Sequence, residues 1–201
     1  MIVLDIETTG LDSLKNGIVS IGAVSFNNPN EIFYEECRID SDDVIDEEAL
    51  KINGFTKEQI TDKNKQSQSE LINNFYFWLG KQDNRILAGH NIGFFDLNFI
   101  KAKVIKYNII IKSRHRSIDL CSVAQTKYFE IYKDFLIDDF KENAMNLPNI
   151  LKFCGLKDNR NKHNALEDAK LAAECFSRLF NGRILFNEYE KYPVPNYLMK
   201  L

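Results

Sequence analysis

GIVSIGAVSFNNPNEIFYEECRI, residues 17–39, is the stretch that decides the fold. Its first ten residues are β-branched and apolar, as in a strand, and NNPN (27–30) is a strong turn signal. EIFYEECRI (31–39) then returns as the second strand of a hairpin. Residues 1–7 are also β-branched and apolar, and Gly10 ends that strand. The N-terminal part is therefore predicted to be an antiparallel meander of three strands.

Helices and shorter strands alternate in the rest of the chain. Two or three short helices are expected across 46–81, the last over SELINNFYFWLG, whose apolar residues recur at helical spacing. RILAG (85–89) has the composition of a buried strand, and RSIDL (116–120) that of another short one. Further helices are expected at residues 95–107, 120–132, 146–154 and 165–180. The pattern predicts an α/β fold with one mixed sheet and helices on its faces.

Composition narrows the class of protein. The chain has 201 residues, 44% of them hydrophobic, which is enough for one domain with a sizeable core. The net charge of −3 excludes a uniformly basic nucleic-acid coat but leaves room for a local basic groove. Four cysteines lie far apart and are expected to be free thiols in a reducing cytoplasm. Neither a signal peptide nor an apolar run long enough to span a bilayer is recognisable, so we expect a soluble, cytoplasmic protein without membrane contact.

Two acids interrupt the first predicted strand. In IVLDIE, Asp5 and Glu7 point to the same side, because alternate residues of a strand share a face. A solvated edge strand would tolerate them. In a central strand, however, two buried like charges are costly unless a cation lies between them. Carboxylates held on a rigid strand are ligands that Mg²⁺ prefers, so the pair favours a metal site.

Two further segments carry acids beside predicted helix starts. Asp96 ends GHNIGFFD (89–96), where it is either a site residue or an acid favoured by the helix dipole. In HNALEDA (163–169), Asn164 has the position of a helix cap, with a glutamate three residues later. Asp168 then lies in the first turn and points inward, while His163 stays on the preceding loop. A spacing of five thus permits a fixed ligand and a mobile acid–base group. The alternatives are a surface loop histidine for His163 and, for Asp168, a first-turn acid favoured by the helix dipole.

These residues, in this order, resemble a known family. The motifs LDIETTGLD (4–12), GHNIGFFD (89–96) and HNALEDA (163–169) are similar to those of the DnaQ-like 3′–5′ exonucleases of the DEDDh type, a resemblance over roughly residues 1–180. It implies a ribonuclease H-like fold with a five-stranded mixed sheet. It also implies two divalent metal ions, Mg²⁺ or Mn²⁺, that hydrolyse phosphodiester bonds from a 3′ end and release nucleoside 5′-monophosphates.

The resemblance assigns a role to each residue of the catalytic set. Asp5 would bridge both ions, and Glu7 and Asp168 would complete the ion that holds the nucleophilic water. Asp96 would act on the second ion, and His163 would take the proton from the water. The terminal nucleotide would contact the backbone of Thr8 and Thr9, together with Gly10, Leu11, Glu48, Asn53, Asn91 and Phe95.

Two of these predicted substrate contacts have special features. Leu11 looks like an apolar wedge between the last two bases, with an ordinary buried side chain as the alternative. Asn53 stands where a histidine is usual in the family, so hydrogen bonding is kept and a charge is lost. Basic residues within 106–116 and 157–162 are candidate phosphate contacts.

Several functions remain open at this level. The first is an exonuclease on single-stranded or frayed DNA, of the proofreading or repair type, which the TTG form of the first motif favours. The same chemistry on RNA or short oligonucleotides is the alternative. A catalytically silent adaptor for a DNA polymerase is disfavoured because all five catalytic positions are intact. Residues 1–181 are predicted to form the exonuclease domain, and 182–201 a tail that either docks on it or binds a partner such as a replication or repair protein.

Overall fold

One five-stranded mixed sheet organises the chain, whose computed structural model describes residues 1–111 and 116–199. The strand order is β3-β2-β1-β4-β5, in which β1 pairs with β2 and β2 with β3 antiparallel, whereas β1–β4 and β4–β5 are parallel. The bounds are β1 (Ile2–Thr8), β2 (Ile18–Ser25), β3 (Ile32–Glu36), β4 (Leu87–Gly89) and β5 (Ser117–Asp119). The predicted meander and the mixed five-stranded sheet are confirmed.

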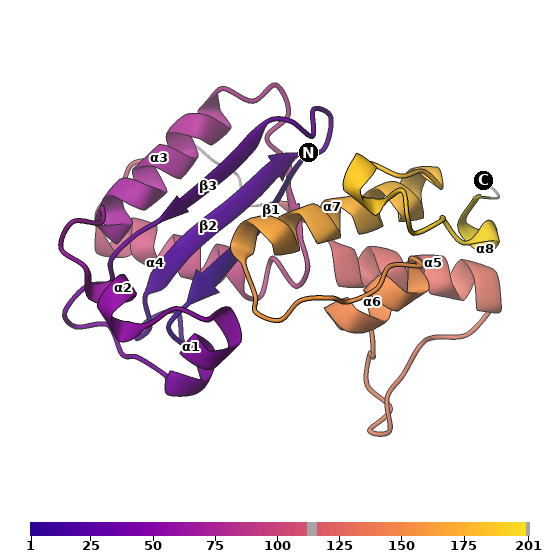
Figure 1. The fold of residues 1–201 in the computed structure, drawn as a ribbon, viewed down its shortest axis with the longest axis horizontal. Coiled ribbons are helices and arrows are strands. Elements are labelled where there is room, and N and C mark those ends of the chain that lie inside the picture. The colour runs from indigo at the N-terminus through magenta and orange to yellow at the C-terminus, as the bar shows by residue number, and fades with distance from the viewer. Residues whose placement is uncertain (112–115, 200–201) are drawn as a thin grey trace.

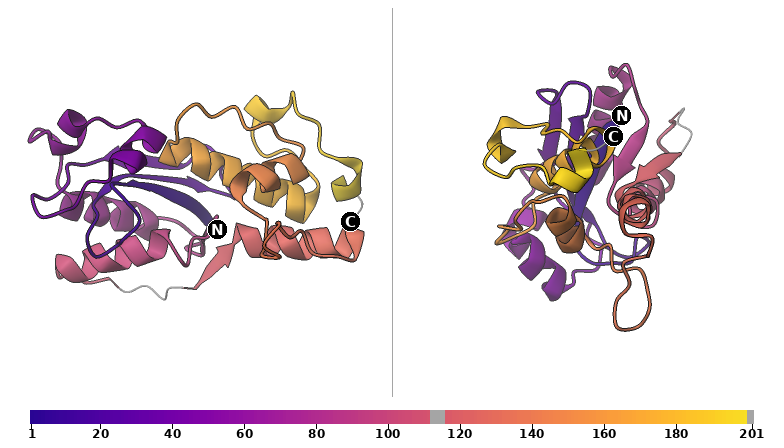
Figure 2. Two further views of the ribbon diagram at one scale, coloured as in Figure 1. Left: turned by 90° about the horizontal axis from the view of Figure 1, so that it is seen from below. Right: turned by 90° about the vertical axis from the view of Figure 1, so that its right-hand side faces the viewer.

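Helices cover both faces of this sheet (Figures 1 and 2). One layer contains α3 (Gln68–Gly80) and α4 (Asp96–Lys106), whose apolar side chains share a core with Ile2, Leu4 and Ile6. The other layer is built around α7 (Ala165–Asn181), which packs on β1 and β2. The remaining elements are α1 (Glu47–Asn53), α2 (Lys57–Thr61), α5 (Leu120–Tyr132), α6 (Leu147–Phe153), the 3₁₀ helix η1 (Asn187–Tyr189) and α8 (Asn196–Met199).

Strand β1 alternates as the sequence predicts. Ile2, Leu4 and Ile6 enter the core on the α3 and α4 side, and Val3 enters the core beneath α7. Asp5 shares the face of Val3 because side chains two residues apart point the same way. Glu7 continues this row. The two acids therefore point toward the start of α7, where HNALEDA (163–169) lies.

A buried ion pair within α7 holds the C-terminal segment through hydrogen bonds to its backbone. Arg178 and Glu174 are fully buried, and Nε of Arg178 lies 2.6 Å from Oε1 of Glu174. Glu174 also accepts hydrogen bonds from the backbone N–H groups of Leu185 and Phe186, and Arg178 donates to the carbonyl of Tyr192. Buried charges are tolerated when they are paired and hydrogen-bonded in this way. The pair anchors the chain that follows α7.

Most element boundaries agree with the sequence to within a residue or two. The largest difference is in β3, which ends at Glu36 and not at residue 39, because its ladder with β2 stops there. Strands β4 and β5 have three residues each where five were predicted, since only those positions form ladder bonds. Asp119 caps α5 by accepting from the Ser122 N–H, as its sequence position indicates. Part of the predicted basic stretch, residues 112–115, lies outside the described residues. Within 1–111 and 116–199, we find no helix with the length and apolar character needed to cross a membrane.

Candidate active site

Strand β1 and its neighbour β2 form the floor of the site. Asp5 pairs with Gly22 across the antiparallel ladder, so both residues face α7. A Cβ atom on Gly22 would overlap the backbone of Ala165 and Leu166 at the start of α7. The missing side chain therefore lets the first turn of α7 approach the sheet beside Asp5 and Glu7.

Helix α4 contributes the third acid. Asp96 is the first residue of this helix and is 2% exposed. Its Oδ1 accepts the backbone N–H of Ile6 at 3.1 Å, which ties the start of α4 to β1. His90 lies nearby and its Nε2 is 3.2 Å from the Met145 carbonyl oxygen, in keeping with a structural role.

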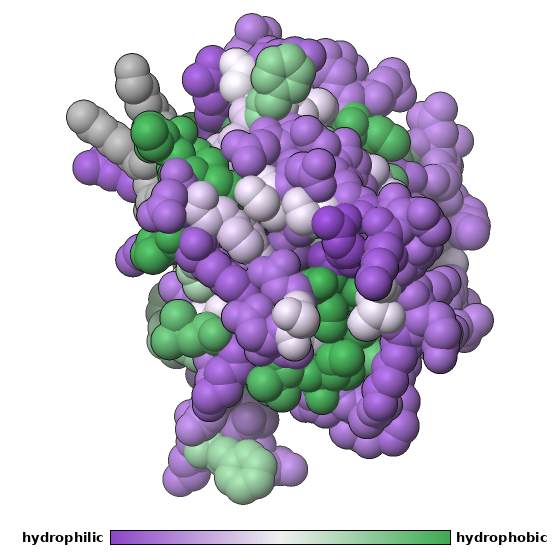
Figure 3. Space-filling model, turned by 90° about the vertical axis from the view of Figure 1, so that its left-hand side faces the viewer, coloured by the Kyte–Doolittle hydropathy of each residue, from purple (hydrophilic) through white to green (hydrophobic). Residues whose placement is uncertain are grey.

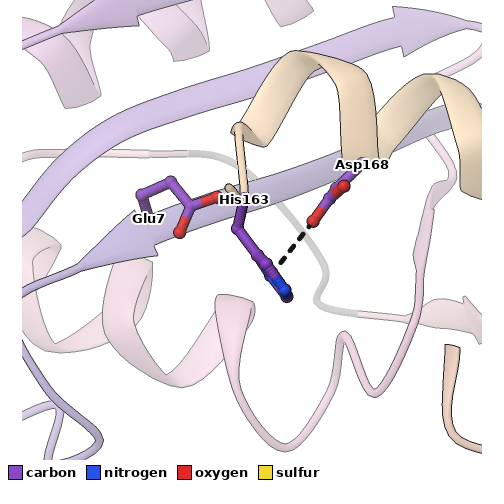
Figure 4. A group of neighbouring side chains, drawn as sticks. All are labelled: Glu7, His163 and Asp168. Carbon is purple, nitrogen blue, oxygen red and sulfur yellow. Dashed lines mark ion pairs between the residues drawn. The ribbon is translucent and has the colours of Figure 1, made fainter. Parts of the chain in front are cut away.

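The start of α7 contributes the last two residues. Asn164 caps the helix, accepting from the N–H groups of Leu166 and Glu167, as predicted. Asp168 in the first turn is 3% exposed and points inward. The loop places His163 over the same point, with its Nδ1 3.3 Å from Oδ2 of Asp168 (Figure 4). The backbone N–H of His163 donates to the Ile52 carbonyl of α1, so the loop is tied to that helix.

Three side chains converge closely enough to share one cation. Glu7, His163 and Asp168 each offer a ligand atom, and these atoms lie within 4.8 Å of one another. Among the described residues, Glu7 Oε1 and Asp168 Oδ1 are buried oxygens with no hydrogen-bond partner. Buried oxygens of this kind are costly unless something pairs with them. The two carboxylates of this set offer oxygen ligands, which suit hard divalent cations and so fit Mg²⁺ or Mn²⁺.

Burial and mutual repulsion raise the pKa values of the clustered acids. Burial, followed by repulsion from Asp168 and Asp96, raises the pKa of Glu7 to about 8. Burial raises the pKa of Asp96 to about 8 against its own backbone hydrogen bonds. The pKa of Asp5 is raised well above its usual range by burial and then by the three neighbouring acids. A raised pKa favours the protonated carboxyl group. Bound divalent ions would displace such protons and keep the carboxylates ionised.

A pocket of about 320 Å³ opens beside the acids and is lined by both polar and apolar residues. It contains six of the eight residues predicted to contact substrate, together with Ile52 and Ala49 of α1, which the sequence did not single out. The six are Thr8, Gly10, Leu11, Glu48, Asn53 and Phe95. Leu11 is 82% exposed, which an apolar wedge requires and a core side chain does not. Figure 3, which views the end of the molecule that carries α1, shows hydrophobic patches set in a hydrophilic surface.

The other predicted contacts have different surroundings. Thr9 is fully buried, and its hydroxyl donates to the Val44 carbonyl and accepts from the Gly17 N–H. Asn91 adopts a positive φ of 52° in the turn before α4 and is not among the residues that line this pocket.

Two residues of α1 use their polar groups within the protein. Asn53 is buried, donates to the Thr8 carbonyl and accepts from the Phe55 N–H. Its amide therefore holds α1 against the end of β1. Glu48 is exposed and forms an ion pair with Lys51 of the same helix.

One cation in the site was not recognised as a site residue from the sequence. Arg160, in the basic stretch 157–162, places Nη1 3.0 Å from Oδ2 of Asp168. Nothing in the residue pattern marks Arg160 off from its basic neighbours, because its position depends on the path of the loop between α6 and α7.

The fold and the site together define a nuclease class: a mixed sheet of ribonuclease H type that presents clustered carboxylates and a histidine at the end of its central strand. Comparison with known proteins makes this specific. A family model described as "Exonuclease" matches residues 2–176, and the chain belongs to that family. The DnaQ-like relationship predicted from the motifs is confirmed by the relatives.

Among these relatives, DNA polymerase III subunit epsilon of Haemophilus influenzae is 30% identical over 94% of this chain and 71% of its own length. DNA polymerase III PolC-type of Thermotoga petrophila is 29% identical over 88% of this chain. The chain spans only 12% of the length of that polymerase.

Solved structures share the fold. Exonuclease I of E. coli, in complex with a deoxyadenosine oligonucleotide, superposes with a TM-score of 0.70 at 17% identity, over 90% of this chain and 40% of that one. Cell-death related nuclease 4 superposes with a TM-score of 0.69 at 14% identity, over 91% of this chain and 64% of that one. At these identities the likeness supports the ribonuclease H-like architecture.

Proposed function

We propose that this chain is a metal-dependent 3′–5′ exonuclease that acts on single-stranded or frayed DNA. The observation that carries the proposal is the convergence of Glu7, His163 and Asp168. Within the described part of the chain, Glu7 Oε1 and Asp168 Oδ1 are buried there without a hydrogen-bond partner. A silent adaptor would have no need to keep such a costly arrangement, since a buried carboxylate oxygen without a hydrogen bond destabilises the fold.

The proposed reaction hydrolyses the last phosphodiester bond of the strand. Divalent ions, when bound, would supply an activated water and stabilise charge on the leaving 3′-oxygen. Asp5, Glu7, Asp96 and Asp168 would hold them. His163 would accept the proton of the attacking water, because it is the one half-exposed member of the set and is oriented by Asp168. The new bond joins water oxygen to phosphorus, and the bond to the 3′-oxygen breaks, which releases a nucleoside 5′-monophosphate.

The substrate class is proposed from the relatives and the pocket. Polymerase subunits among the relatives and an exonuclease bound to a deoxyoligonucleotide among the structural neighbours favour DNA. The exposed Leu11 and the aromatic ring of Phe95 line the pocket, where an unpaired base could stack. RNA or short oligonucleotides remain the second candidate substrate.

We also propose the wider context. Residues 1–181 would form the exonuclease domain, a division supported by the family match that ends at residue 176. The contacts of Arg178 and Glu174 favour a docked tail over a partner-binding one. A DNA polymerase or another replication or repair protein is the proposed partner, acting in the cytoplasm, because several relatives are polymerase chains or subunits.

The test uses matched 5′-labelled DNA and RNA oligonucleotides with Mg²⁺ or Mn²⁺. An EDTA control and the Asp5→Ala variant accompany each substrate. We expect a metal-dependent ladder that shortens from the 3′ end, faster on DNA and absent in the variant. Faster shortening of RNA would transfer the proposal to the second substrate, and no shortening of either would contradict it.

A further inference from the structure

The loop between α6 and α7 brings a positive charge into the acid cluster. The Arg160 side chain is only 10% exposed, and its Nη1 donates to Oδ2 of Asp168 at 3.0 Å. Its other nitrogens are held by Asp158, which accepts from Nε at 2.9 Å and from Nη2 at 2.8 Å. The guanidinium thus bridges one acid on the loop and one acid of the proposed metal site in a two-sided geometry that a lysine cannot reproduce.

The two oxygens of Asp168 have different surroundings as a result. Oδ2 faces both Arg160 Nη1 and, at 3.3 Å, His163 Nδ1. Oδ1 is buried and, within the described chain, has no hydrogen-bond partner, like Glu7 Oε1. Arg160 therefore pairs with the oxygen that also faces His163 and leaves Oδ1 as the other oxygen of the carboxylate. It also fixes the carboxylate plane, which decides where Oδ1 points.

We propose that Arg160 is a positioning residue for the metal site, which holds Asp168 by Oδ2 so that Oδ1 is directed at the ion, with Asp158 anchoring the guanidinium. This inference rests on the proposed metal-dependent function. Partners that hydrogen-bond to a metal-ligating carboxylate set its orientation, and losing such a partner weakens metal binding by about 10–100-fold.

The opposite role is also physically possible and makes the inference testable. A guanidinium beside four acids could act as a resident cation that competes with the metal. Removing it would then tighten metal binding, because a like charge is taken away. The sign of the change in affinity therefore separates the two roles.

The experiment measures Mn²⁺ binding without nucleic acid, from the electron paramagnetic resonance signal of the free ion. Arg160→Gln is expected to weaken Mn²⁺ binding by about 10–100-fold. Asp158→Asn leaves Arg160 in place but loosens it, so a smaller loss in the same direction is expected. Lys162→Gln is the matched control, since it removes the same charge from the same loop, where the Lys162 side chain lies against Gly54. It should change the affinity less than about threefold.

Unchanged or tighter Mn²⁺ binding in Arg160→Gln would overturn the inference. If Arg160→Gln does not fold, unchanged or tighter Mn²⁺ binding in Asp158→Asn would overturn the inference. Turnover gives a second readout: saturating Mn²⁺ should restore the rate of Arg160→Gln, and a persistent loss at saturation would contradict a positioning role. Failure of the unaltered protein to bind Mn²⁺ would instead count against the proposed function itself.

Discussion

Gly22 offers a sharp test of how the fold builds the site. This residue lies in β2, directly opposite Asp5, and touches the first turn of α7. In Gly22→Ala, the new methyl group would overlap the carbonyl carbon of Ala165 and the amide nitrogen of Leu166. Both are backbone atoms, so no side-chain rotation can relieve the overlap. The helix or the strand must move.

The size of the effect follows from the overlap. The new Cβ would lie 2.2 Å from both atoms. Non-bonded carbon atoms rest about 3.5–4.0 Å apart, so the first turn of α7 and the strand must separate by roughly 1.3–1.8 Å. Overpacking of this kind costs about 1–3 kcal/mol of folding free energy. Asp168 moves with the turn, and a displacement of about 1 Å at a reacting centre can cost on the order of 10²-fold in rate. We therefore expect turnover to fall further than stability alone would explain.

The assay compares Gly22→Ala with Gly80→Ala, which adds the same methyl group at the end of α3. A Cβ at Gly80 meets no atom within 4 Å, so that variant should keep full turnover. Initial rates on a 5′-labelled DNA oligonucleotide are measured at a temperature where denaturant titrations find both proteins folded. Unchanged turnover in Gly22→Ala would refute the idea that close approach of α7 to β2 places Asp168.

The remaining predictions concern individual side chains. Asp5→Ala should abolish turnover on labelled DNA, and wild-type rates would overturn its assignment as a metal ligand. His163→Ala should lower the rate by about 10²–10⁴-fold, while Mn²⁺ titration finds the affinity largely kept; a parallel loss of affinity would argue for a ligand role instead. Burial raises the pKa of Glu7 from 4.5 to about 8. Between these two pH values, the folded metal-free protein holds a proton on Glu7 that the unfolded chain has released. In EDTA, the free energy of unfolding of the protein should therefore fall as the pH rises from 4.5 to about 8. Mn²⁺ should flatten this dependence on pH. A free energy of unfolding that does not change with pH in EDTA would contradict the raised pKa of Glu7. Arg178→Met leaves the Glu174 carboxylate buried and unpaired, so denaturant titration should detect a loss of about 3–5 kcal/mol, and a loss below 1 kcal/mol would show that the pair does not anchor the tail.

Strand alternation and helix capping are sufficient to predict where several site residues lie. Strand alternation placed Asp5 and Glu7 on one face, where the structure has them. The cap at Asn164 explained how His163 and Asp168 meet despite a spacing of five, because the chain changes from loop to helix between them. These inferences hold because each depends on only a few neighbouring residues.

Contacts between distant segments could not be predicted in the same way. The bond from Arg160 to Asp168 depends on the path of an irregular loop, for which periodicity carries no information. The inward orientation of the Asn53 amide depends on where Thr8 ends its strand. The family resemblance assigned Asn53 to substrate contact, a role that remains a prediction, whereas its hydrogen bonds hold α1 in place.

The most direct test of the exonuclease proposal is to follow a single-stranded DNA labelled in its 3′-terminal nucleotide. The reaction is started with Mn²⁺, with Asp5→Ala and EDTA as controls. We predict that the first labelled product is the nucleoside 5′-monophosphate, released before any internal fragment and only when metal and Asp5 are both present. Labelled fragments longer than one nucleotide, or release that persists in EDTA, would contradict a metal-dependent attack on the last phosphodiester bond.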